Sequence, residues 1–246
     1  MKRALGIFPA YAPPNNLAAT VNDQANWSVT LPRRGFVPTW LIGQVATRPQ
    51  IISWIQQFVA SVQPGDSAAL VFCGHGATSG GHQCIVGSDL QPVWDHELQA
   101  MLSLTSPSAK LDVVLDCCYA GTGSYDREAE DRDPNAPPKI DQTIVPQVFK
   151  GKLKIPKNAV PPVDVAERTV PAWREWAAGS PTQITYGVMS GGKMNSLFSL
   201  FECWALRVYP TMIAVDIMNN VRQYVVAVIP SQVPQLTGMN LDQVPF

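Results

Sequence analysis

The chain has no long hydrophobic run and no large excess of charge, and each absence argues against a class of protein. No stretch approaches the roughly 18–20 apolar residues of a membrane-spanning helix. The apolar segment ALGIF near the N-terminus is too short for the core of a signal peptide. The net charge is −1 at pH 7, which argues against attraction to nucleic acid or to an anionic membrane.

The five cysteines form neither a disulfide framework nor a zinc pattern. Their number is odd, Cys117 and Cys118 are adjacent, and no C-x-x-C spacing occurs. Such thiols suit a reducing compartment. We therefore expect a cytoplasmic protein.

What the chain does have is enough apolar sequence for a substantial core. Of its 246 residues, 46% are hydrophobic and 15% are charged, and this length suits a single domain. Short apolar runs predict strands over residues 3–8, 36–42, 67–73, 83–86, 111–116 and 182–190.

Helical periodicity appears between these runs. It predicts helices over residues 17–31, 95–104, 197–208 and 211–228, and one more after Thr47, which can cap a helix. Strands that alternate with helices predict an α/β fold with a mainly parallel sheet covered on both faces.

Residues 125–181 differ from the rest of the chain. They contain a mixed charge cluster, several prolines and a run of lysines, and they lack a sustained apolar period. We expect a long insertion here, either a solvated surface segment or a mobile or cleavable loop beside the functional site. The tail over residues 230–246 is also expected to be a loop.

Two expected strands end in segments that carry reactive side chains. Residues 67–73 run into a GHG triplet whose histidine is His75, and residues 111–116 run into Cys117 and Cys118. Parallel strands present such residues at one edge of the sheet, so a cysteine–histidine dyad is expected there. Alternation sends the two cysteines to opposite faces, and spacing alone does not choose between them.

These motifs resemble the peptidase C14 superfamily, and within it the metacaspases and bacterial orthocaspases. The family motif D-[SA]-C-H-S-G-T is similar to DCCYAGT at residues 116–122, which makes Cys118 the nucleophile and Cys117 the stand-in for a small residue. LAATVND at residues 17–23 looks like the family's L-x-G-C-x-N-D, and QVPQLTG at residues 232–238 is similar to its Q-T-P-Q-L-S-G.

The resemblance implies a caspase-like (caspase–hemoglobinase) α/β fold. This is a three-layer sandwich with a mainly parallel sheet, here one domain over residues 1–246 with the insertion at about 125–181. The implied activity is a cysteine endopeptidase cutting after Arg or Lys, with His75 and Cys118 as the dyad and the backbone of Gly76 and Cys118 binding the oxyanion. The family's pocket for the basic side chain corresponds to Asp23, Asp116, Thr20 and Cys73.

The chain departs from the family pattern near these positions. Tyr119 and Ala120 replace the histidine and serine that follow the nucleophile. Cys73 replaces a serine before GHG, and Thr20 replaces a cysteine of the pocket. These changes bear on the pocket more than on the dyad.

Many metacaspases need calcium, a cation that takes about six to eight oxygen ligands. The loop after GHG has no acid here, and only Asp89 and Asp126 lie near the places expected for calcium ligands. We therefore predict that no cofactor is required, with these two residues as the calcium candidates.

The expected substrates are proteins or peptides with Arg or Lys at P1, bound by a monomer without nucleic acid or membrane. The resemblance also implies self-processing in the insertion. Its candidate sites are Arg127, Arg132, Lys139, Lys150, Lys152, Lys154, Lys157, Arg168 and Arg174.

Two other functions remain open. One is a catalytically weak or inactive caspase-like binding or regulatory module, which Tyr119 favours. The other is a non-peptidase α/β hydrolase or thiol transferase. This second alternative would need a serine nucleophile or another cofactor, and no G-x-S-x-G, GxGxxG or P-loop motif is present.

Overall fold

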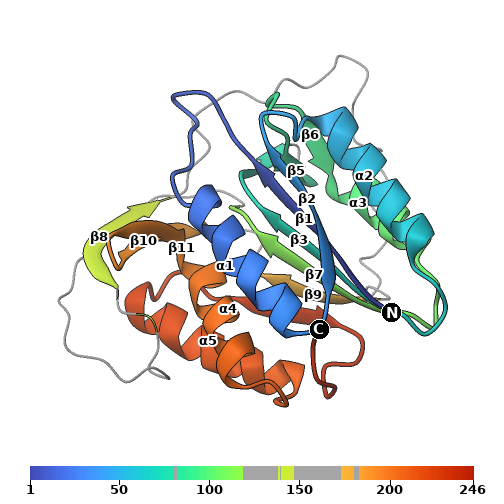
Figure 1. Cartoon of the computed structure of the whole chain (residues 1–246). Helices are drawn as coiled ribbons and strands as arrows, with labels where there is room; N and C mark the ends of the chain where they lie inside the picture. The colour runs from blue at the N-terminus through green and yellow to red at the C-terminus, as the bar shows by residue number, and fades with distance from the viewer. Residues whose placement is uncertain (80–81, 119–137, 139, 147–172, 180–182) are drawn as a thin grey trace.

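The computed structural model describes residues 1–79, 82–118, 138, 140–146, 173–179 and 183–246. Its centre is a six-stranded sheet in the order β12-β9-β7-β3-β1-β2 (Figure 1). The strands are β1 (Lys2–Pro9), β2 (Val37–Gly43), β3 (Ser67–Cys73), β7 (Lys110–Asp116), β9 (Arg174–Ala177) and β12 (Gln235–Gly238). Neighbours from β2 to β9 are parallel, and β12 is antiparallel to β9. The predicted mainly parallel sheet is confirmed.

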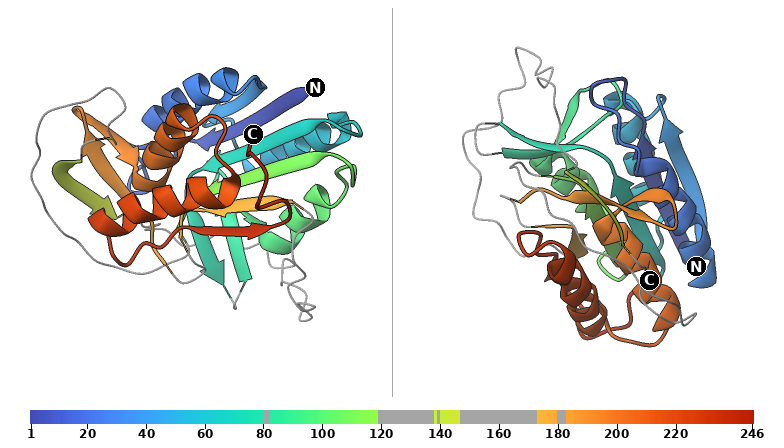
Figure 2. Two further views of the ribbon diagram at one scale, coloured as in Figure 1. Left: turned by 90° about the horizontal axis from the view of Figure 1, so that it is seen from below. Right: turned by 90° about the vertical axis from the view of Figure 1, so that its left-hand side faces the viewer.

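Helices cover both faces of this sheet, which makes the predicted three-layer α/β sandwich (Figures 1 and 2). One apolar cluster includes residues of α1 (Thr20–Arg33), α4 (Leu197–Val208) and α5 (Ala214–Val228). The other includes residues of α2 (Arg48–Ser61) and α3 (Asp95–Leu102). Both sheet faces are therefore buried, as the continuous apolar runs of β1, β3 and β7 require.

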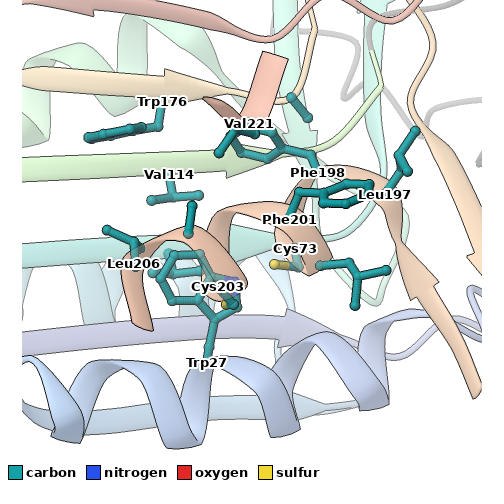
Figure 3. Close-up of a cluster of buried hydrophobic side chains, with 14 of the residues drawn as sticks. Trp27, Cys73, Val114, Trp176, Leu197, Phe198, Phe201, Cys203, Leu206 and Val221 are labelled. Carbon is teal, nitrogen blue, oxygen red and sulfur yellow. The ribbon is translucent and has the colours of Figure 1, made fainter. Parts of the chain in front are cut away.

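The first cluster contains several of the largest fully buried side chains. Trp27 of α1, Trp176 of β9 and Phe198 of α4 are each 0% exposed, and Figure 3 shows them with Cys73 and Cys203 between the helices and the sheet. Helix α4 was predicted over its observed residues, and its position between α1 and α5, against β10 and β11, makes it apolar on nearly every side.

Two small antiparallel sheets extend from the central one. β4 (Gly76–Ser79), β5 (His82–Val86) and β6 (Pro92–Trp94) form a hairpin sheet directly after His75. β8 (Asp141–Pro146), β10 (Tyr186–Ser190) and β11 (Lys193–Ser196) form the other, beside α4. No helix of the described residues is long and apolar enough to cross a bilayer.

Two predictions about loops are wrong in part. The insertion contains β8 and β9, and the tail contains β12. β9 belongs to the central sheet because its Asp112–Arg174 register places a buried ion pair between β7 and β9. β12 forms the edge of the sheet, and its last residue is Gly238. The φ of Gly238 is 104°, a value that favours glycine, and a Cβ at this position would collide with the Trp173 carbonyl.

Candidate active site

The segments that carry His75 and Cys118 lie against each other at the carboxyl edge of the sheet. β3 and β7 are paired up to Cys73 and Asp116, and the Gly74 N–H donates to the Asp116 carbonyl at 3.1 Å. A Cβ on Gly76 would lie 2.0 Å from the Cys118 carbonyl oxygen. The predicted meeting of the two strand ends is confirmed, and only glycine fits at position 76.

Cys117 and Cys118 point to opposite faces of the sheet, as alternation predicted. Cys117 packs in the cluster under α2 and α3, whereas Cys118 belongs to the cluster under α1, α4 and α5. Asp116 also faces α4, because its carboxylate accepts the N–H of Ser199 at 3.1 Å. One face therefore carries both the candidate nucleophile and an acid of the candidate pocket.

The ring of His75 is held by two residues of the loop after β1. Its Nε2 lies 2.6 Å from the carbonyl oxygen of Asn15, and its ring centroid lies 4.5 Å from that of Tyr11. The Tyr11 hydroxyl accepts the His75 N–H at 2.9 Å and donates to the Val86 carbonyl at 2.7 Å. A carbonyl can only accept, so Nε2 carries the proton and Nδ1 is the basic nitrogen.

The thiol of Cys118 contacts Thr185, in the segment before β10. The Thr185 N–H donates to Cys118 Sγ at 3.1 Å, and the Thr185 hydroxyl lies 3.2 Å from the same sulfur. The cysteine is 2% exposed. The segment that carries Thr185 therefore covers the candidate nucleophile in this conformation.

Gln232, the first residue of the QVPQLTG motif, holds the segment that carries Thr185 in place. Its Oε1 accepts the Tyr186 N–H at 3.0 Å, and its Nε2 donates to the Ala178 carbonyl at 3.0 Å. Ala178 in turn donates to the Leu115 carbonyl of β7 at 3.1 Å. Gln232 thus connects the residue after Thr185 to the strand that ends beside Cys118.

Burial sets the protonation of both dyad candidates. Loss of solvent lowers the pKa of His75 to about 4 and raises the pKa of Cys118 to about 11. At neutral pH the ring and the thiol are both uncharged. A nucleophilic thiolate must therefore form by proton transfer during attack, or after the site opens.

The two acids of the candidate pocket are brought together under α4. Asp23 accepts the Ser196 N–H at 2.8 Å, and Asp116 accepts the Ser196 hydroxyl and the Ser199 N–H. Both carboxyls are 1% exposed. Asp116 Oδ1 has no hydrogen-bond partner among the described residues.

Burial also acts on the charge of this acid pair. It raises the pKa of Asp116, and burial together with the charge of Asp116 raises the pKa of Asp23 well above its usual value. Two buried carboxyls that have so few hydrogen-bond donors, and no paired cation in the described part of the chain, are poorly compensated. Such a pair of carboxyls is suited to binding a positively charged group of a ligand.

The other two pocket candidates lie close to these acids in the fold. Cys73 Sγ is 3.4 Å from the Ser199 hydroxyl, which also accepts a hydrogen bond from the Trp27 indole at 3.1 Å. Thr20 is the first residue of α1 and is buried. Sequence reasoning missed Ser196 and Ser199, because nothing in their local sequence links them to residues some 80 positions earlier.

Glu202 is a further buried acid, and no feature of the local sequence singles it out. It lies on α4, is 0% exposed, and neither carboxyl oxygen has a hydrogen-bond partner among the described residues. Burial, together with the charges of Asp116 and Asp112, raises its pKa well above the usual value. The folded protein therefore holds a proton on Glu202 that the unfolded chain releases above about pH 4.5.

Glu202→Gln should therefore flatten the dependence of stability on pH. In the wild type, the free energy of unfolding falls as pH rises between the ordinary and the raised pKa, by up to about 1.4 kcal/mol per pH unit from this group. Urea unfolding from pH 5 to pH 8 measures the slope. The exposed Asp216→Asn variant is the control, and an unchanged slope in Glu202→Gln would contradict the assignment.

Of the two calcium candidates, the structure describes only Asp89, which lies near the start of α2. Asp89 Oδ1 accepts the N–H groups of Arg48 and Gln91 at 3.1 and 3.3 Å, so it caps α2. Thr47 is the N-cap residue of this helix, as predicted, but its side chain makes no cap hydrogen bond among the described residues. Asp126 lies outside the described residues.

Most of the self-processing candidates, together with Tyr119 and Ala120, also lie outside the described residues. Arg174 is described, and it is an unsuitable cleavage site. It lies in β9 of the central sheet, is 4% exposed and is paired with Asp112.

Comparisons with known proteins agree with this architecture. The model of the metacaspase, peptidase C14 domain matches residues 2–125. A comparison with curated proteins found no match. Protein GSU0716 from Geobacter sulfurreducens aligns with a TM-score of 0.64 at 17% identity, over 97% of this chain and 94% of its own.

Two caspases align as well. Caspase-1 from Spodoptera frugiperda gives a TM-score of 0.59 at 14% identity, over 97% of this chain and 86% of its own. The Drosophila initiator caspase Dronc gives 0.63 at 11% identity, over 100% and 82%. At such identities these structures show the fold, which is that of the caspases.

The fold and the family match together define a caspase-like protein of peptidase family C14. Within that class, the chain belongs to the metacaspases. This membership supports a cysteine-peptidase function in general.

Proposed function

We propose that the protein is a cysteine endopeptidase that cleaves after arginine or lysine, with Cys118 as nucleophile and His75 as general base. The observation that carries the proposal is the pair of strand ends. β3 and β7 bring GHG and the Cys118 turn into contact, and Asn15 fixes the His75 tautomer with Nδ1 as the base. All five cysteines are free thiols, which supports the cytoplasmic location proposed with it.

In the proposed reaction the thiol proton passes to His75 as Sγ attacks the scissile carbonyl carbon. The carbonyl oxygen becomes an oxyanion, for which the backbone N–H groups of Gly76 and Cys118 are the proposed donors. The imidazolium then protonates the leaving amine as the C–N bond breaks, which leaves a thioester on Cys118. Water then attacks the thioester carbon while His75 takes one of its protons, the C–S bond breaks, and the proton passes from His75 to the Cys118 sulfur.

The acid pair supports the choice of a basic P1 side chain. A guanidinium or ammonium near Asp23 and Asp116 would donate charge-assisted hydrogen bonds to both carboxylates. It would also lower the raised pKa of each and so restore the charged forms. An acidic P1 side chain would bring a third carboxyl and no cation, and would raise these pKa values further.

Hydrolysis of matched peptides with Arg, Lys, Leu or Asp at P1 tests this specificity. The wild type should prefer Arg and Lys, and Asp116→Asn should lower kcat/KM for the Arg peptide roughly 100-fold, since a buried charge pair loses one partner. The Leu peptide is the internal control and should change little. Preference for Asp, or an equal loss on all four peptides, would overturn the pocket.

The second candidate is a regulatory caspase-like module without turnover. The covering of Cys118 by Thr185, with the raised thiol pKa, favours it. An active-site-directed thiol reagent separates the two: labelling of Cys118 in the native protein supports the peptidase, and failure to label supports the module.

A further inference from the structure

A cluster outside the dyad contains two of the chain's three histidines. His82 lies at the start of β5, and Asp95 and His96 lie in the first turn of α3. One potential ligand atom from each residue lies within 4.8 Å of the others. All three residues are partly exposed, so the cluster lies near the surface.

The arrangement within the cluster leaves a potential ligand atom unused. His96 Nδ1 is shielded from solvent and lies 3.6 Å from Asp95 Oδ1, and it has no hydrogen-bond partner among the described residues. The rings of His82 and His96 are 6.2 Å apart and nearly perpendicular, at 81°. Neighbouring Glu97 is already engaged by Arg48 and by the Trp94 N–H, so Asp95 is the carboxylate that faces the histidines.

We propose that His82, Asp95 and His96 bind a divalent transition metal of the zinc type. Two imidazoles and one carboxylate suit Zn²⁺, Co²⁺ or Ni²⁺, whereas Ca²⁺ and Mg²⁺ require mainly oxygen ligands. Tetrahedral bonds of about 2.0–2.1 Å place ligand atoms roughly 3.4 Å apart. Metal binding requires rotation of the three partly exposed side chains to this spacing, with water completing the coordination.

This site is separate from the dyad. His82 pairs with Ser79, three residues beyond Gly76, which is about 10 Å along β4. A bound ion would join β5 to α3 and so anchor the far end of the hairpin that follows His75. The site needs neither Cys118 nor peptidase activity, so it stands or falls independently of the proposed function.

The test uses the full chain with Cys118→Ala, so that the dyad thiol cannot bind the metal. Titration with Co²⁺, followed by visible absorption, and with Zn²⁺, followed by calorimetry, should show one site. Adding His82→Ala or His96→Gln should weaken binding roughly 10-fold or more. Adding His75→Ala, the matched control, should leave binding unchanged.

Thermal unfolding gives a second measurement of metal binding, and it also shows whether each variant is folded. Zn²⁺ should raise the Tm of Cys118→Ala but not that of Cys118→Ala with Asp95→Asn, and Ca²⁺ or Mg²⁺ at equal concentration should not replace it. Absence of saturable Co²⁺ binding overturns the proposal. So does binding that survives His82→Ala and His96→Gln, or that disappears with His75→Ala.

Discussion

Cys118→Ala should lower kcat for an Arg-P1 peptide by roughly 10³-fold or more. The variant lacks the sulfur that forms the thioester, and removal of a nucleophile costs nearly as much as removal of the whole dyad. His75→Ala should cause a loss of similar size, and the double variant should be no worse than either single one. Steady-state hydrolysis measures all three.

Cys117→Ala is the matched control, because it removes the adjacent buried thiol from the opposite face of the sheet. It should retain turnover. Mass spectrometry of the purified proteins adds a second readout: fragments ending at Arg or Lys within residues 125–181 should occur in the wild type and be missing in Cys118→Ala. Full activity in Cys118→Ala, or loss confined to Cys117→Ala, would remove Cys118 from its proposed role.

The parts of this site that lie on continuous strands were predictable from sequence. β3 and β7 are apolar runs that are followed by reactive side chains. The alternation of side chains along a strand is enough to send Cys117 and Cys118 to opposite faces of the sheet. Parallel pairing then brings His75 to the same edge. Such inferences need only the period of a strand and the geometry of a parallel sheet.

The groups that surround the dyad were not predictable in this way. Asn15 and Thr185 reach the site from loops through backbone groups that have no sequence signature, and the QVPQLTG motif that contains Gln232 does not show which groups its amide binds. The strands β9 and β12 were missed because each has only four residues, too few to show a period. Their place in the sheet depends on contacts made across the chain.

The contact that fixes β9 is a buried ion pair, and Arg174→Met should destabilise the protein by about 3–5 kcal/mol. Arg174 donates to both oxygens of Asp112 and, through Nη1, to the carbonyls of Asn240 and Gln243 at 2.7 and 3.1 Å. Removing the guanidinium leaves a buried carboxylate facing β9 without its cation. Urea unfolding measures the loss in the free energy of unfolding.

Arg3→Met is the matched control, since Arg3 pairs with Asp66 but its side chain is 34% exposed. It should cost about 1 kcal/mol or less. Asp112→Asn combined with Arg174→Met should recover part of the stability, because the remaining amide is uncharged and still accepts the Trp176 indole N–H. Equal effects in the buried and exposed arginine variants would show instead that β9 is held by its apolar contacts, with Trp176 rather than the ion pair fixing the strand beside β7.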